Sequence, residues 1–242
     1  MTPYIFIGFS GNFGDFADIV HACGGYVRKV VVNLPTDTML GAKTFDERLA
    51  NYREFVRSRG IAETVELEHL RHFKPTSADR HVLAARGLAL LPLQRYLMDV
   101  LGILPEPLVH PTAILSPTVT LPGGVIIRAA AVIGSGAILG PFSTIGTSAY
   151  IGHDCELADN TTVNPNASLA SFTKLQQGAR VGIGATIINE STLGEQCFVA
   201  AGAVVTQDVP PCTLVAGVPA VVKKHLPPQL IADVVAGLED IF

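Results

Sequence analysis

The hydrophobic positions in the second half of the chain recur every six residues. From Leu115 to Val205, each sixth residue is leucine, isoleucine or valine, and the residue four positions later is small or β-branched. An α-helix, with about 3.6 residues per turn, does not give this spacing, and neither does a strand, with a period of about two. A fixed six-residue period is typical of a parallel β-helix, in which short strands stack into coils around an aliphatic core.

Sixteen such repeats, taken three to a coil, predict a three-sided prism of about five coils. We expect glycines at its corners, where they follow the inward aliphatic residues: Gly134, Gly140, Gly146, Gly152, Gly182 and Gly194. Cys155 and Cys197 occupy the small position of the repeat, so their side chains should point into the core. The four cysteines show no framework spacing, and free thiols are therefore expected.

The first part of the chain has a different pattern. An apolar run at residues 4–9 enters a glycine-rich turn, a helical periodicity covers residues 13–23, and a second β-rich run covers residues 27–33. Strand, helix and strand in this order predict a βαβ unit and a Rossmann-like α/β domain. Thr44, followed by Asp46 and Glu47, predicts the start of a second helix with Leu49, Tyr52, Phe55 and Val56 on one face.

A strand at residues 81–85 and a helix at 90–101 complete this α/β domain. The proline-rich stretch at 104–107 then reads as a linker. We thus expect an α/β domain at 1–107, an all-β left-handed parallel β-helix at 108–226 and a short C-terminal amphipathic helix at 227–242.

The composition and charge of the chain argue against several classes of function. The chain has 242 residues, 48% hydrophobic and 16% charged, with a net charge of −4, as in a compact globular protein. This balance gives no reason to expect nucleic acid or an acidic membrane as a partner. The start lacks the pattern of a signal peptide, and no apolar stretch approaches 18 residues, so we expect no membrane span and a cytoplasmic location.

His153 is the single histidine of the repeats from 115 to 209, and Asp154 follows it. With Ile151 pointing inward, His153 falls at or beside a corner, outside the core. An imidazole beside a carboxylate suits a general base, although an ordinary solvated histidine would fit the same spacing. A solenoid of this kind that binds zinc needs three imidazoles converging on the metal, which one histidine per chain does not supply, so no metal is expected.

Taken together, several motifs make the chain resemble the left-handed β-helix acyltransferases, and within them the sialic acid and bacillosamine acetyltransferase family. The motifs are GFSGNFG at 8–14, LVHPTA at 108–113, GHDC at 152–155, GIGA at 182–185, AAGAVV at 200–205 and GVPA at 217–220. The resemblance covers nearly the whole chain and is weakest at 36–80. It implies an acetyl-CoA-dependent homotrimer with an N-terminal domain that binds a nucleotide-linked sugar.

The resemblance also implies roles for individual residues. His153 is the base that deprotonates the acceptor, and Asp154 raises its basicity. The thioester carbonyl meets the backbone N–H of Ser171, between adjacent subunits. Other implied acyl-CoA contacts are Thr162, Gly182, Ala201, Gly202, Gly217, Lys223 and Lys224.

The residues expected to bind the acceptor depart from the sequence pattern of the family. Ser10, Gly11 and Asn12 offer backbone donors at a helix N-terminus, a natural phosphate site, and Asn33 matches a position that contacts the base or ribose. The family motif Gly-x-x-Gly-His-Gly nevertheless ends here in Asn12 and the bulky Phe13. The family often has a second histidine nine residues after the base, where this chain has Thr162.

Two alternatives stay open. One is an acyl-carrier-protein-dependent acyltransferase of the lipid A type, and a hydrophobic lining around Phe172 and Phe198 would leave this question open. The other is a catalytically silent sugar-binding or scaffold trimer. The acceptor sugar and its nucleotide, the choice between N- and O-acylation, and the acyl group are open at this point.

Overall fold

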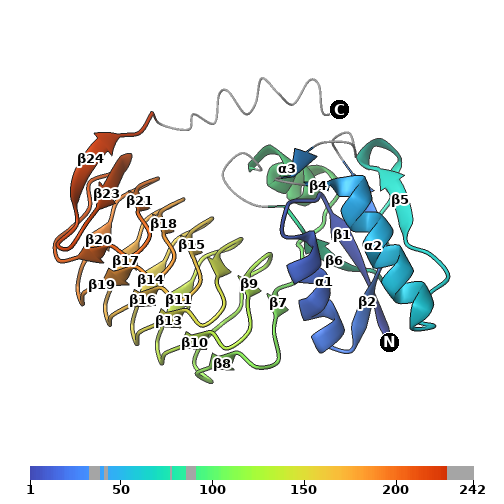
Figure 1. The fold of residues 1–242 in the computed structure, drawn as a ribbon, viewed down its shortest axis with the longest axis horizontal. Coiled ribbons are helices and arrows are strands. Elements are labelled where there is room, and N and C mark those ends of the chain that lie inside the picture. The colour runs from blue at the N-terminus through green and yellow to red at the C-terminus, as the bar shows by residue number, and fades with distance from the viewer. Residues whose placement is uncertain (33–38, 41–42, 77, 86–90, 228–242) are drawn as a thin grey trace. The chain divides into compact units, whose positions relative to one another are not determined.

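The computed structural model describes residues 1–32, 39–40, 43–76, 78–85 and 91–227. The chain divides between Glu106 and Pro107 into two compact units, which are described separately (Figure 1).

The first unit is built on a parallel N-terminal sheet with strand order β5-β2-β1-β6. Its strands are β1 (Thr2–Ile7), β2 (Gly25–Val32), β5 (Glu66–His69) and β6 (Arg80–Leu83), and a short antiparallel pair is formed by β3 (Met39–Leu40) and β4 (Lys43–Thr44). Helix α1 (Phe13–Ala22) connects β1 to its parallel neighbour β2, so these three elements form a βαβ unit (Figure 1). A 3-10 helix (Leu70–His72), α3 (Leu91–Arg95) and a π-helix (Tyr96–Val100) follow.

Helix α2 (Phe45–Ser58) begins as predicted, because Thr44 is its N-cap in a complete capping box. The Thr44 hydroxyl accepts from the Glu47 N–H at 3.2 Å, and the Glu47 carboxylate accepts from the Thr44 N–H at 2.7 Å, so two donors of the first turn are satisfied. Tyr52 and Val56 are buried as expected, whereas Phe55 is 39% exposed.

The second unit is a parallel β-helix of two-residue strands, as the six-residue period predicts. Successive strands of each sheet pair 18 residues apart, as Tyr150 does with Ser168. Sheet 1 contains β8 (Ile114–Leu115), β10 (Val132–Ile133), β13 (Tyr150–Ile151), β16 (Ser168–Leu169), β19 (Thr186–Ile187) and β22 (Val204–Val205). Sheet 2 contains β11 (Ile138–Leu139), β14 (Glu156–Leu157), β17 (Lys174–Leu175) and β20 (Thr192–Leu193).

Sheet 3 contains β7 (Leu108–Val109), β9 (Ile126–Ile127), β12 (Thr144–Ile145), β15 (Thr162–Val163), β18 (Arg180–Val181) and β21 (Phe198–Val199). It ends in an antiparallel hairpin of β23 (Thr213–Ala216) and β24 (Val221–His225). Cys155 and Cys197 point into the core, as predicted, and both are fully buried. Leu121 keeps the sequence period but lies in a segment, 116–125, without a strand.

The corner glycines are explained by contact between coils. A Cβ on Gly152 would lie 2.7 Å from the backbone nitrogen of Ser171, and one on Gly182 would lie 2.5 Å from that of Ala201. The left-handed backbone of each corner falls two residues later, for example at Asp154 with φ 56°. These glycines therefore let one coil approach the next closely.

None of the helices in the described part of the chain is long and apolar enough to cross a membrane. The predicted C-terminal helix at 227–242 lies, apart from Pro227, outside the described residues.

Candidate active site at a corner of the β-helix

His153 and Asp154 lie on the turn that leads from sheet 1 to sheet 2, which we call the 1–2 corner. Ile151, at the end of β13, is fully buried, and the chain then turns outward, so His153 stands outside the core as predicted. Its Nδ1 lies 2.7 Å from Oδ2 of Asp154, and both side chains are about half exposed, at 52% and 51%. Because the carboxylate accepts, Nδ1 carries the proton, and Nε2 is left as the basic nitrogen.

The neighbouring coil fixes the position of Asp154. Its N–H donates to the Ser135 carbonyl at 2.9 Å, with the residue itself in the left-handed region. A Cβ on Gly136 would collide with the Asp154 carboxylate. Glycine at 136 thus leaves the space in which this carboxylate reaches the imidazole.

Ser171 and Phe172 lie one coil further along the same corner. The Phe172 N–H donates to the His153 carbonyl at 3.1 Å, and its ring meets the imidazole edge-on, with 5.1 Å between the centroids. Phe172 is 46% exposed and has φ 62°. The Ser171 N–H makes no hydrogen bond within the described residues. The corner therefore combines an exposed imidazole, an aromatic ring beside it and a backbone N–H donor.

The thiol beside this pair belongs to the core. Cys155 is fully buried and its Sγ donates to the Ala170 carbonyl at 3.2 Å. Burial raises the pKa of the Cys155 thiol, which keeps it protonated and poorly nucleophilic.

The other acyl-CoA residues implied by the resemblance lie elsewhere in the second unit. Gly182, Ala201 and Gly202 are on the turns that lead from sheet 3 to sheet 1, the 3–1 corner, and Thr162 is on β15 of sheet 3. The 3–1 corner and the 1–2 corner lie along opposite edges of sheet 1. One chain alone therefore does not bring these residues together with His153.

The outer face of sheet 1, between these two corners, carries no charged side chain. Its outward residues are Ile114, Val132, Tyr150, Ser168, Thr186 and Val204. Ile114 and Tyr150 are 65% and 43% exposed. Sheet 2 instead presents an ion pair between Lys174 and Glu156, at 2.9 Å.

The terminal hairpin holds the last group of predicted residues. Gly217 directly follows β23 and has φ 107°, while Lys223 and Lys224 are exposed on β24. Across the described residues, no group of three or more histidine, cysteine, aspartate or glutamate side chains is arranged to hold a metal.

In the first unit, Ser10, Gly11 and Asn12 form the turn after β1, at the carboxyl end of that strand. The Asn12 N–H donates to the Ser10 hydroxyl at 3.3 Å. The unexpected Phe13 is 1% exposed and packs edge-on against Phe6 and Phe45, so it is a core residue. Asn33 lies outside the described residues.

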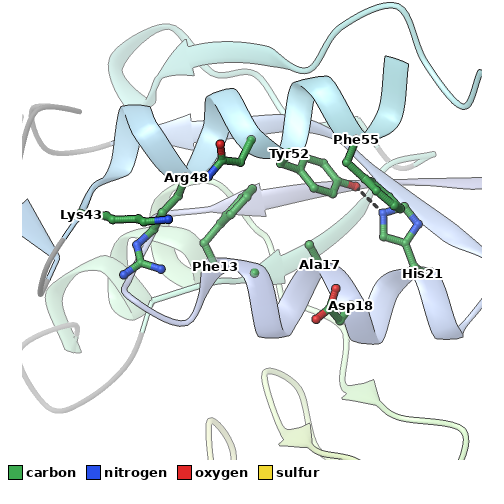
Figure 2. Close-up of a pocket in the computed structure, with 10 residues that line it drawn as sticks. Phe13, Ala17, Asp18, His21, Lys43, Arg48, Tyr52 and Phe55 are labelled. Atoms are coloured by element: carbon green, nitrogen blue, oxygen red, sulfur yellow. Dashed lines mark hydrogen bonds between the residues drawn. The ribbon is translucent and has the colours of Figure 1, made fainter. Parts of the chain in front are cut away.

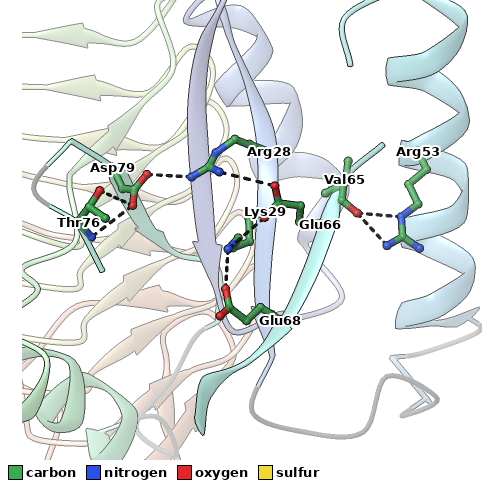
Figure 3. A network of polar contacts seen from close by, with 8 residues as sticks. All are labelled: Arg28, Lys29, Arg53, Val65, Glu66, Glu68, Thr76 and Asp79. Carbon is green, nitrogen blue, oxygen red and sulfur yellow. Dashed lines mark hydrogen bonds and ion pairs between the residues drawn. The ribbon is translucent and has the colours of Figure 1, made fainter. Parts of the chain in front are cut away.

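A polar network that the sequence did not signal connects three strands of the N-terminal sheet or their ends (Figure 3). Arg28 of β2 bonds Asp79 at 2.9 Å, and its neighbour Lys29 bonds Glu68 of β5 at 2.6 Å and Glu66 at 3.1 Å. Burial alone would raise the pKa of Asp79. Hydrogen bonds from Thr76 and the positive charge of Arg28 outweigh this effect and hold the pKa of Asp79 below its usual value. These charged groups are paired with one another, so we assign them a structural role in the N-terminal sheet.

Comparison with known proteins gives structural matches. No protein-family model matches the chain, and a search of curated protein sequences finds no significant match. Among solved structures, the chain is similar to PerB from Caulobacter crescentus in complex with CoA and GDP-perosamine, with 28% identity, 93% of this chain and 98% of that chain covered, and a TM-score of 0.70.

It is also similar to the acetyltransferase domain of PglB from Neisseria gonorrhoeae, with 25% identity, 93% and 100% coverage and a TM-score of 0.69. WeeI from Acinetobacter baumannii, with 18% identity, 91% and 100% coverage and a TM-score of 0.61, shares the fold. Structures of the C. crescentus N-acetyltransferase with one histidine replaced by asparagine or alanine are similar as well.

Proposed function

We propose that this chain, which belongs to the hexapeptide-repeat left-handed β-helix acyltransferases, transfers an acetyl group from acetyl-CoA to an amino group of a nucleotide-linked sugar. The carrying observation is the 2.7 Å contact between His153 and Asp154 on an exposed corner. The C. crescentus neighbour, an N-acetyltransferase with CoA and GDP-perosamine bound, supports the choice of donor, acceptor class and nitrogen.

In the proposed reaction, the amine nitrogen of the acceptor attacks the thioester carbonyl carbon, and Nε2 of His153 takes a proton from this nitrogen. Asp154 stabilises the imidazolium that forms. The tetrahedral oxyanion accepts a hydrogen bond from the Ser171 N–H. When the C–S bond breaks, the proton held by His153 passes to the sulfur, and CoA leaves as the thiol. A thioester is already activated, so one base and one positioned donor are sufficient.

The active site is completed by a second copy of the chain in a homotrimer. In a ring of three identical prisms, the contact between neighbours joins different surfaces of the two chains. If the uncharged face of sheet 1 turns toward the threefold axis, the 1–2 corner of one subunit meets the 3–1 corner of the next. His153 would then face Gly182, Ala201 and Gly202 of the neighbour, with the pantetheine between them.

Lys223 and Lys224 would pair with the CoA phosphates near Gly217, while Thr162 offers a weaker hydroxyl contact to the donor. Residues 1–107 serve as a Rossmann-like acceptor domain, with the turn Ser10–Gly11–Asn12 holding the phosphates of the nucleotide sugar. Because acetyl-CoA and nucleotide sugars are cytoplasmic metabolites, the proposed location is the cytoplasm.

A donor with a longer acyl chain is the second candidate. The observation that favours it is the half-exposed ring of Phe172 against the base, since an apolar wall there would also suit an acyl chain. Comparing acetyl-CoA with medium-chain acyl-CoA and acyl carrier protein donors distinguishes the two.

The test follows CoA release with a thiol reagent over a panel of GDP-, UDP- and dTDP-linked amino sugars. We expect His153→Ala to lower kcat by about 10²- to 10⁴-fold, the usual worth of a general base. Asp154→Asn should lower kcat less, with the KM for acetyl-CoA unchanged. His110→Ala is the matched control, because His110 contacts Thr112 in the first coil of the same β-helix. No turnover with any acceptor, together with no acetyl-CoA binding, would contradict the proposal.

A further inference from the structure

A cavity of about 290 Å³ lies between α1 and α2 of the first unit (Figure 2). Helix α1 contributes Phe13, Asp18 and His21, and α2 contributes Arg48, Tyr52 and Phe55. Lys43 of β4, two residues before α2, lies beside Arg48 at one end (Figure 2). The cavity thus has a cationic end and an aromatic end.

The charge of the lining favours an anion. Lys43 and Arg48 contribute two positive charges, against the single carboxylate of Asp18. Burial lowers the pKa of His21, so this imidazole is neutral near pH 7. The lining therefore carries a net positive charge although the whole chain carries −4.

The aromatic end is fixed by its own hydrogen bonds. The Val27 N–H donates to the Tyr52 hydroxyl oxygen at 2.9 Å, and this hydroxyl contacts Nε2 of His21, also at 2.9 Å. Burial raises the pKa of Tyr52 to about 12, so the hydroxyl keeps its proton and donates it to His21. The Phe55 ring lies 5.0 Å from His21 and 6.1 Å from Tyr52. Since these polar groups are already paired, this end offers ring surfaces to a ligand.

We propose that this cavity binds a small organic anion that carries one planar ring. The ring lies against Tyr52 and Phe55, and the anionic group lies between Lys43 and Arg48. Ligand pockets usually span about 300–1,000 Å³, so this cavity suits a single-ring compound. The anionic group is a phosphate or a carboxylate. The lining includes none of the individual residues assigned to the acetyl transfer proposed above, and it begins at Phe13, the residue that follows the turn Ser10–Gly11–Asn12.

The experiment is a ligand-observed saturation-transfer NMR titration of the full chain with phenyl phosphate, phenylacetate and the neutral 2-phenylethanol. We expect saturable binding of at least one anion at millimolar concentration or below, and weaker binding of the neutral alcohol. The tighter of the two anions identifies phosphate or carboxylate as the group that is recognised.

Four variants locate the binding. Lys43→Gln should weaken it by about two- to fivefold, the effect of one exposed ion pair, and Phe55→Ala by about three- to tenfold, the effect of one aromatic contact. Arg57→Gln is the control on the same helix, because Arg57 pairs with Glu54 and does not line the cavity. Asp18→Asn should strengthen binding by removing the carboxylate, a gain that misfolding does not produce.

The proposal is overturned if neither anion binds saturably to the unmodified chain, or if 2-phenylethanol binds as tightly as both. It is equally overturned if Lys43→Gln and Phe55→Ala, shown to be folded by their thermal unfolding, bind like the Arg57→Gln control.

Discussion

At the scale of single residues, two residues of the 1–2 corner have a left-handed backbone conformation that most non-glycine residues avoid. Asp154 and Phe172 both have left-handed φ values, 56° and 62°. This conformation costs a non-glycine residue about 1–2 kcal/mol of conformational free energy, and asparagine and aspartate tolerate it best. Asp154 suits the position, whereas Phe172, like Phe142 at another corner, is bulky. The left-handed conformation recurs at the corners of the β-helix and belongs to the fold, and at this corner it accompanies the contact of Phe172 with His153.

Replacing Phe172 should therefore separate stability from activity. We expect Phe172→Asn to raise the free energy of unfolding by about 0.5–1 kcal/mol, because asparagine adopts the left-handed region more readily. The same change should lower kcat/KM, because the imidazole loses its aromatic wall. Gln196→Asn, at another left-handed corner with φ 53°, should give the stability gain alone. Thermal unfolding and steady-state kinetics of both variants test this, and a loss of stability in Phe172→Asn would contradict it.

The buried side chain of His81 makes the stability of the first unit depend on pH. His81 is 8% exposed and packs edge-on against Phe73. Burial lowers its pKa, although Asp79 and Glu106 act in the opposite direction. Since the unfolded chain binds this proton more readily, unfolding becomes easier as pH falls below about 6.5.

We expect the free energy of unfolding to decrease by at most about 1.4 kcal/mol per pH unit for this one group. The loss that comes from Asp79 begins only at about pH 4, where the carboxyl of the unfolded chain takes up a proton while the folded one, with its lowered pKa, stays ionised. Urea titrations between pH 7 and pH 5 measure the effect. His81→Phe should reduce the slope, and an unchanged slope would exclude His81 as its source.

At the scale of elements, the sequence predicted what depends on periodic burial. The six-residue spacing located the β-helix strands, and the Thr44–Glu47 spacing located the start of α2, because burial and capping act on nearby residues. Strand β5 was not predicted, since its residues Glu66 to His69 are mostly polar and are held by ion pairs across strands. The contact of Phe172 with His153 joins residues 19 positions apart, and it becomes visible only once the 18-residue coil is known.

The coil contacts also make the corner glycines of the β-helix sensitive to substitution. An added methyl group at Gly152 would meet the Ser171 nitrogen at 2.7 Å. We expect Gly152→Ala to lower the free energy of unfolding by about 1–3 kcal/mol, as overpacking does, and to displace the Ser171 N–H from the active site. Gly184→Asn is the control, because nothing lies within 4 Å of its Cβ and its φ of 65° suits asparagine. Equal melting temperatures for the two variants would contradict this explanation.

At the scale of the whole molecule, the position of the two corners on opposite edges of sheet 1 underlies our proposal that two chains form each active site. Complementation tests this directly. His153→Ala removes the base from the 1–2 corner, and Ala201→Trp blocks the 3–1 corner, where Ala201 is exposed. Each variant alone should be inactive, because every site in its trimer contains the same defect.

A trimer reassembled from equal amounts of the two variants contains some intact sites. A site is intact when its 1–2 corner comes from the Ala201→Trp chain and its neighbouring 3–1 corner from the His153→Ala chain. Random assembly in a closed ring gives this combination in about one quarter of the sites, so about one quarter of the unmodified activity should return. Sedimentation of the mixture verifies the trimer, and Tyr150→Glu, which places a charge on the face of sheet 1, should prevent both assembly and recovery. If the mixed trimer stays inactive, the site lies within one chain.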